Sequence, residues 1–101
     1  MLMASLKDFR IDDDLAGAQQ RSIEVVVTMD DGALRWCYFM TPAALASAGD
    51  WVPGTQVRFH YGAPHMIVVS ELSADIISRV LRYLDRSGDL VLCTRAVEGA
   101  G

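Results

Sequence analysis

The chain has 101 residues, of which 51% are hydrophobic and 22% are charged, and its net charge at pH 7 is −4. This length and composition predict one globular domain, because such a chain can bury a single core and is too apolar to stay disordered. The acidic balance argues against nucleic-acid binding, which depends on a basic surface. No apolar stretch has the roughly 18 residues of a membrane span, and the N-terminus lacks a secretory signal pattern. We therefore expect a soluble, cytoplasmic protein without a membrane partner.

Residues 1–21 form the least regular part of the chain, since the stretch IDDDLAGAQQR follows neither a helical nor a strand period for long. Asp12, Asp13 and Asp14 are interpreted as a solvated charge run, because calcium loops space their aspartates alternately instead of consecutively. The expected division is an N-terminal arm or short helix at residues 1–21, one α+β domain at residues 22–97 and a frayed tail at residues 98–101.

The clearest pattern is the stretch IEVVVTMDDGALRWCYFM at residues 23–40, which has two β-rich runs separated by turn residues. Asp31 and Gly32 predict a two-residue type I′ turn, and this turn fixes the pairing of the two strands. In that register Val27 lies opposite Trp36, and one face of the hairpin is entirely apolar. The other face is then expected to carry Val26, Cys37 and Phe39.

Two segments have the capping residues and the spacing of helices. Thr41 is a good N-cap for the first helix, and Pro42 suits its first helical position. Gly49 ends this helix. Ser73 caps the second helix, which Gly88 terminates. The apolar stripe of the second helix comprises Ile76, Ile77, Val80, Leu81 and Leu84.

Three more strands are expected at residues 56–61, 65–70 and 89–97. The second of these is apolar throughout, which predicts a central position in the sheet. The element order ββαββαβ predicts a single two-layer α+β domain, with a mostly antiparallel sheet of about five strands and two helices on one face. A ferredoxin-like arrangement with an extra N-terminal strand is the more specific alternative.

Both histidines of the chain, His60 and His65, flank the Gly-Ala-Pro sequence at residues 62–64. Proline excludes a two-residue type I′ turn, so a three-residue loop is expected to pair Tyr61 with His65 and to place the two rings on opposite sides of the sheet. A four-residue loop would leave His65 in the turn. No cysteine or carboxylate lies at ligand spacing, so we expect neither a metal nor a cofactor. The catalytic alternative is a small enzyme or ligand-binding protein with a site near His60, His65, Tyr61 and Arg58.

Arg79, Arg82 and Arg86 form a basic stripe along the second helix. This stripe could receive an acidic partner, but Asp75 stands four residues before Arg79, which is also the pattern of a solvated helix face. Trp51 is the one large aromatic residue expected in a loop, where it serves as a lid over the core or as a binding anchor.

The sequence contains neither the nucleophile motif G-x-S-x-G nor a phosphate-binding glycine motif. Cys37 has no nearby group that would lower its pKa, so it is expected to be an inert thiol. Val26, Cys37 and Phe39 would leave an apolar surface on the hairpin, and homodimers are the commonest oligomers. The sequence therefore favours a small non-catalytic protein-binding module (a regulator, accessory or immunity-type factor) that acts as a homodimer or binds another protein.

Overall fold

Strand β2 (Ile23–Met29) forms the middle of the sheet, and its side chains alternate between a buried and a more exposed side. The computed structural model describes residues 4–47, 50–59 and 65–97. Ile23, Val25 and Val27 are completely buried, whereas Glu24 on the other side is exposed. Because successive side chains of a strand point to opposite faces, this pattern buries one face of the sheet only.

The turn between β2 and β3 (Leu34–Met40) has three residues instead of the predicted two. The Met29 amide donates to the Ala33 carbonyl at 2.9 Å, and Gly32, with φ of 88°, donates to the Met29 carbonyl at 3.0 Å. A type I turn followed by a left-handed glycine is the usual three-residue hairpin loop. Asp30 therefore joins Asp31 and Gly32 in the loop, and the predicted register is wrong by one residue.

This one-residue shift turns every side chain of β3 to the opposite face. Cys37 now lies opposite Val25 and Phe39 lies opposite Ile23, and both are completely buried. Trp36 and Tyr38 take the other face of the sheet, where they are partly exposed. The prediction that Val26, Cys37 and Phe39 share an outer surface is therefore wrong for Cys37 and Phe39.

Strand β1 (Leu6–Ile11) pairs with β2 along the edge of the sheet, so part of the expected arm at residues 1–21 belongs to the domain. A bulge between Leu6 and Asp8 interrupts the strict alternation, which explains why the sequence shows no strand period here. A single 3-10 turn, η1 (Ala18–Gln20), follows. The β1 side chains that pack against the core are Leu6, Phe9 and Ile11.

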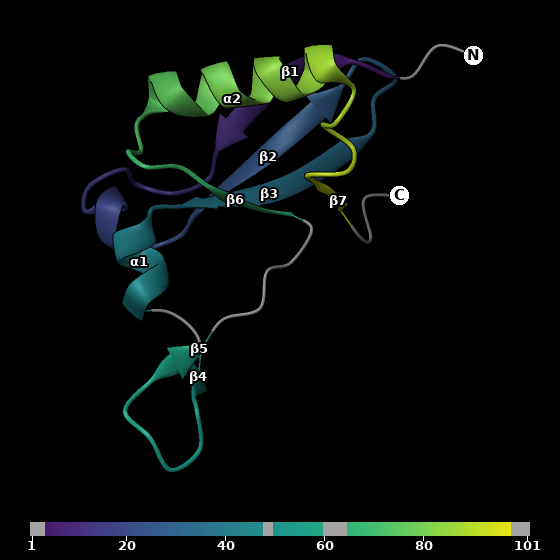
Figure 1. The fold of residues 1–101 in the computed structure, drawn as a ribbon. Coiled ribbons are helices and arrows are strands. Elements are labelled where there is room, and N and C mark those ends of the chain that lie inside the picture. Colours follow the sequence, from purple (N-terminus) through teal and green to yellow (C-terminus); the bar gives the residue numbers. More distant parts are fainter. Residues whose placement is uncertain (1–3, 48–49, 60–64, 98–101) are drawn as a thin grey trace.

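Strands β6 (Met66–Val68) and β7 (Arg95–Ala96) both pair with β3, and both lie along the same edge of it (Figure 1). Strand β6 is parallel to β3 and β7 is antiparallel to it. The apolar strand predicted at the centre of the sheet is thus an edge strand. Its parallel partner β3 is directly adjacent, whereas a split ferredoxin-like arrangement needs a strand between the parallel pair.

Helix α2 (Ala74–Ser87) covers the buried face of the sheet (Figure 1). The Ser73 hydroxyl accepts a hydrogen bond from the Ile76 amide at 3.2 Å, and Gly88 ends the helix with φ of 82°, so both predicted caps are confirmed. Its fully buried residues are Ile77 and Leu81. The core cluster consists of Ala18, Ile23, Val25, Val27, Met29, Cys37, Phe39, Leu72, Ile77, Leu81 and Leu90.

Helix α1 (Pro42–Ser47) begins after Thr41, whose hydroxyl accepts a hydrogen bond from the Ala44 amide at 3.2 Å. It contacts η1 and β3. Strands β4 (Asp50–Trp51) and β5 (Arg58–Phe59) pair with each other in a separate two-stranded ribbon. Because β5 belongs to this ribbon and β6 belongs to the main sheet, the predicted hairpin between residues 56–61 and 65–70 is wrong.

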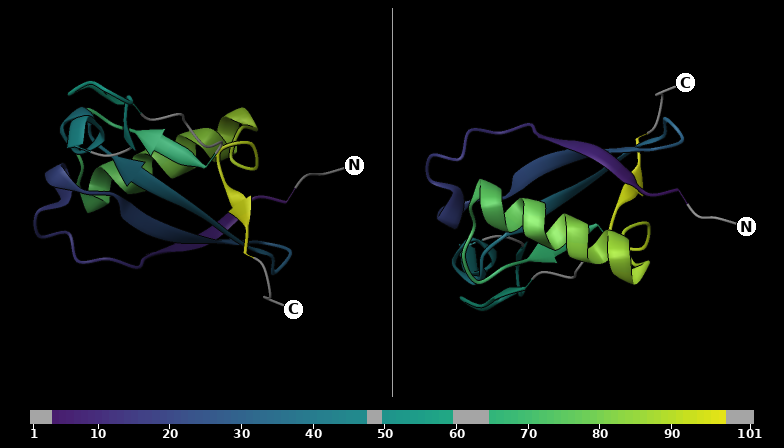
Figure 2. Two further views of the ribbon diagram at one scale, coloured as in Figure 1. Left: turned by 90° about the horizontal axis from the view of Figure 1, so that it is seen from below. Right: turned by 90° about the horizontal axis from the view of Figure 1, so that it is seen from above.

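The described residues form a single small α+β domain with an open, mostly antiparallel five-stranded sheet and two α-helices, as the sequence predicted. Seen from below, the strands lie in front of α2 and no helix of the described residues crosses them (Figure 2). We call this uncovered side the open face. None of the helices in the described residues is long and apolar enough to cross a membrane. The open-face side chains on β2 and β3 are Glu24, Val26, Thr28, Leu34, Trp36 and Tyr38.

Candidate functional site

His65 immediately precedes β6 and is buried against two aromatic residues of β3. Its ring centroid lies 4.4 Å from that of Trp36 and 5.2 Å from that of Tyr38, in an edge-on arrangement with the second. Its carbonyl accepts a hydrogen bond from the Tyr38 amide at 3.0 Å. The predicted partners His60 and Tyr61 fall outside the described residues, and so does the side chain of Arg58. Of the four candidate catalytic residues, only His65 has a described side chain, which packs among aromatic rings.

The open face carries an apolar strip across β2 and β3, defined by Val26, Leu34, Trp36 and Tyr38. Leu34, the first residue of β3 after the turn, is 39% exposed. The strip borders a shallow depression of about 340 Å³, lined by Arg10, Asp12, Glu24, Val26, Leu34, Trp36 and Val97.

Charges of both signs surround the apolar strip. Arg10 donates from Nε to the Asp12 carboxylate at 2.6 Å, and this hydrogen bond lowers the pKa of Asp12. Glu24 lines the same depression, and Arg95 lies on the strand pair beside Trp36. The surface is therefore neither basic nor acidic as a whole. Asp13, the next residue of the predicted charge run, also makes a local contact. Its carboxylate accepts a hydrogen bond from the Glu24 amide at 2.9 Å.

A second depression, of about 370 Å³, lies where β6 and β7 begin. Arg35 links β3 to the turn before β7 through three hydrogen bonds. Its Nε donates to the Thr94 hydroxyl at 2.7 Å, and its Nη2 donates to the carbonyls of Val91 and Thr94 at 3.0 and 2.9 Å. Arg35 is not among the predicted site residues, because the predicted register placed it on the other side of the sheet. The depression is lined by Arg35, His65, Val91, Leu92, Thr94, Arg95 and Ala96.

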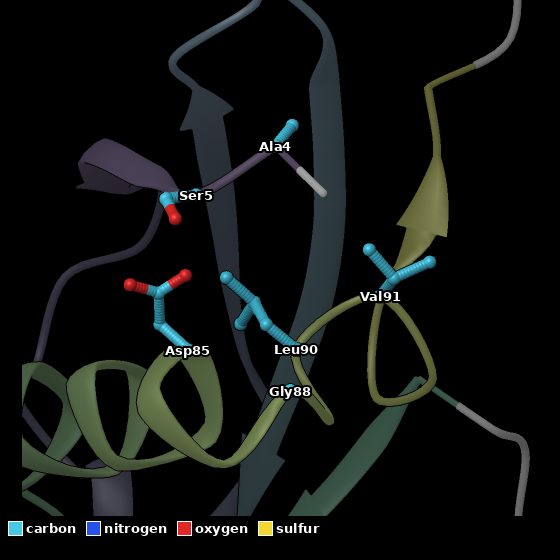
Figure 3. Close-up of a pocket in the computed structure, with 6 residues that line it drawn as sticks. All are labelled: Ala4, Ser5, Asp85, Gly88, Leu90 and Val91. Carbon is cyan, nitrogen blue, oxygen red and sulfur yellow. The ribbon is translucent and has the colours of Figure 1, made fainter. Parts of the chain in front are cut away.

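A third cavity, of about 60 Å³, lies between the start of β1 and the end of α2. Figure 3 shows the Asp85 carboxylate and Leu90 directed toward the backbone near Ser5. The Asp85 carboxylate accepts a hydrogen bond from the Leu6 amide at 2.9 Å. A cavity of this size holds only a few water molecules. Asp85 therefore holds β1 against the helix.

The arginine stripe of α2 is exposed along its length. Arg79 pairs with Asp75 at 2.8 Å, and the Arg82 Nε donates to the Ser78 hydroxyl at 3.2 Å. These local contacts fit the solvated helix face that was the alternative interpretation. Trp51 lies on the β4–β5 ribbon, more than half exposed and outside the core cluster, so it does not cover the core.

The two cysteines are free thiols. Burial, and then the neighbouring Cys93, raises the pKa of Cys37 to about 12. Burial and the charge of Asp89 also raise the pKa of Cys93. Such thiols are protonated near neutral pH and are weak nucleophiles. Among the described residues, no group of three or more histidine, cysteine, aspartate or glutamate side chains could hold a metal ion.

The site residues thus form two separate surfaces, the apolar strip of the open face and the depression around Arg35. No family model matches the chain, and neither a curated protein nor a solved structure matches it at a significant level. Any function must therefore be argued from the geometry of these two surfaces.

Proposed function

We propose that this chain is a small non-catalytic protein-binding module that pairs with a second copy of itself through the open face. The observation that carries the proposal is the uncovered apolar strip of Val26, Leu34, Trp36 and Tyr38. A two-layer domain normally leaves polar side chains on the water-facing side of its sheet. Here an aromatic pair and two aliphatic residues occupy that side.

Contact with another apolar surface would remove this strip from water, with a gain of about 25 cal/mol for each Å² of apolar area buried. Sheets pack face to face by this means, with the side chains of the two inner faces interdigitating. The open face offers a sheet surface of this kind, and no helix of the described residues occupies it (Figure 2).

The charges around the strip support a second copy as the partner. In a twofold symmetric interface the same patch is used on both subunits, so each charge meets a residue of that same patch. Arg10 and Arg95 supply positive charge, while Asp12 and Glu24 supply negative charge. A patch with both signs can place opposite charges together when it pairs with itself, whereas a patch of one sign would repel its own copy.

Cys37 and Cys93 are free thiols, which supports a location in the reducing cytoplasm for this binding module. The alternative function, catalysis near His65, would need a second polar group within hydrogen-bond reach of the imidazole. The described ring contacts of His65 are instead with Trp36 and Tyr38. These contacts support a binding surface over a catalytic one.

The test is the molecular mass in solution, measured by light scattering over a range of protein concentrations. We expect twice the chain mass of 11.1 kDa for the unmodified protein. Leu34→Glu should weaken the dimer, and Tyr83→Glu is its control, because Tyr83 is a large exposed side chain on α2, away from the open face. Burial of the exposed part of Leu34 in two copies is worth about 1–2 kcal/mol, so the dimer dissociation constant should rise about tenfold or more.

A monomer at every concentration would refute the pairing of two copies. A dimer that Tyr83→Glu disrupts as strongly as Leu34→Glu would also refute it, because the interface would then not be the open face. A dimer sensitive to Leu34→Glu alone would support the proposal.

A further inference from the structure

The edge of β3 has an interruption where β6 and β7 begin. Met66 pairs with Tyr38 and Arg95 pairs with Trp36, and from these points the two strands run in opposite directions along β3 (Figure 1). His65 precedes the first of these pairs. The depression of about 370 Å³ lies at this interruption, and its size is within the range of small-molecule sites.

Arg35 is a partly buried cation that lines this depression. Three of its five N–H groups donate to the 91–94 turn, which holds the guanidinium in one orientation. The two N–H groups on Nη1 have no acceptor among the described residues, and no carboxylate of those residues pairs with this arginine. A fixed, partly buried guanidinium with unused donors is suited to receive an anion.

The other charged residue that lines the depression has the same sign. Arg95 lies on the neighbouring strand, and among the described residues the lining contains no aspartate or glutamate. This is a local reversal of charge, since the chain as a whole carries −4 at pH 7. A concave surface lined by one sign of charge concentrates the opposite ion.

Part of the lining is apolar, which narrows the chemistry of the anion. Val91, Leu92 and Ala96 line the depression, and Leu92 is 70% exposed. An exposed leucine beside a fixed guanidinium suits a ligand with a charged end and an apolar body. A bare phosphate ion would satisfy the arginine and would leave these apolar side chains in water.

We propose that the depression around Arg35 binds the carboxylate of a small organic acid, with the apolar body of the acid resting on Leu92 and Val91. The carboxylate accepts hydrogen bonds from Nη1 of Arg35. This ligand site lies beyond the proposed pairing of two copies. The two surfaces adjoin at Arg95, but no residue of the apolar strip lines the depression, so a change at Leu34 tests the pairing alone.

The probe is 4-phenylbutyrate, titrated into the full chain and followed by the amide signals of the 91–96 segment in NMR spectra. The comparison compounds are 4-phenylbutanol, which lacks the charge, and inorganic phosphate, which lacks the apolar body. Arg35→Gln is the obvious variant, but Arg35 also holds the 91–94 turn, so its loss could unfold the domain. Leu92→Asp therefore serves as the main variant, and Val57→Asp is its control, with an apolar residue of similar exposure in the described β4–β5 ribbon.

We expect the acid to bind about tenfold more tightly than the alcohol, as a charge-assisted hydrogen bond requires. Leu92→Asp should weaken acid binding about fivefold through like-charge repulsion, and Val57→Asp should leave it unchanged. The same results should hold in the Leu34→Glu background, which separates this site from the pairing of copies. Equal binding of acid and alcohol, equal effects of the two aspartate variants, or phosphate binding as tight as that of the acid would each overturn the proposal.

Discussion

The buried position of Phe39 provides the most direct test of the hairpin register. In the observed register Phe39 lies opposite Ile23 in the core, and its neighbour Tyr38 lies on the open face. In the register with a two-residue turn these positions would be exchanged. The variants Phe39→Ala and Tyr38→Ala therefore form a matched pair whose order of stability depends on the register alone.

The magnitudes follow from what each ring contacts. Phe39 is completely buried, and truncation of a core phenylalanine to alanine costs about 3–5 kcal/mol. Tyr38 is partly exposed, with ring contacts to Trp36 at 6.3 Å and His65 at 5.2 Å between centroids. Aromatic pairs of this kind contribute about 0.5–1.5 kcal/mol each, so Tyr38→Ala should cost about 1–2 kcal/mol.

The assay is urea unfolding followed by circular dichroism. With a slope of about 1–1.5 kcal/mol per molar urea for a domain of this size, Phe39→Ala should lower the midpoint by about 2–5 M and Tyr38→Ala by about 0.7–2 M. Because small domains have only about 5–15 kcal/mol of stability, Phe39→Leu is included as a milder core variant, with a cost of about 1.5 kcal/mol or less. A larger loss for Tyr38→Ala than for Phe39→Ala would refute the three-residue turn.

Three further predictions concern the cap of α2, the buried thiol and the arginine that fastens β3. Ser73→Ala should cost about 1 kcal/mol and lower Tm by about 4–8 °C, because the Ile76 amide loses its acceptor. The free energy of unfolding should fall by about 1.4 kcal/mol per pH unit above pH 9. The reason is that the Cys37 thiol of the unfolded chain ionises there, whereas the folded thiol, with a pKa of about 12, stays protonated. Urea midpoints at pH 8 and pH 10 measure this fall. Arg35→Met should cost about 2–4 kcal/mol in thermal unfolding, because its hydrogen bonds to the 91–94 turn are lost while its apolar stem is kept.

Each of these predictions has a control. The exposed Ser70 is the comparison for the cap, and an equal loss of stability in Ser70→Ala would contradict the capping argument. Cys37→Ala removes the buried thiol, so an identical fall in stability with pH in this variant would show that other groups cause it. A shift below about 0.5 kcal/mol for Arg35→Met would mean that the observed hydrogen bonds contribute nothing net to stability.

Local chemistry in the sequence predicted the elements whose ends carry their own signals. Ser73 and Gly88 define α2 because a hydroxyl acceptor and a left-handed glycine complete the hydrogen bonds of a helix end. The alternation of β2 predicted its buried face correctly, and the α+β class with its open, mostly antiparallel sheet followed from the order of the elements. These features depend only on residues close together in the chain.

The register of β3 depended on a choice that the local sequence left open. Asp30, Asp31 and Gly32 fit a three-residue loop as well as a two-residue turn, since glycine supplies the positive φ in both. Both faces of β3 contain apolar residues, so its pattern alone did not select the buried one. Packing against Ile77 and Leu81 of α2 placed Phe39 and Cys37 inside, and Trp36 and Tyr38 were left on the open face.

The sequence by itself therefore determined the helix caps, the buried face of β2 and the fold class, because each of these rests on short-range periodicity or on a single end residue. Only the tertiary structure decided which strands pair: β1 with β2, β4 with β5, and both β6 and β7 with β3. These pairings brought Arg35 to the 91–94 turn and to His65, and they left the apolar strip of the open face uncovered. The physical reason is that edge pairing satisfies backbone hydrogen bonds, which every residue except proline offers equally, so side-chain patterns do not specify which edges meet.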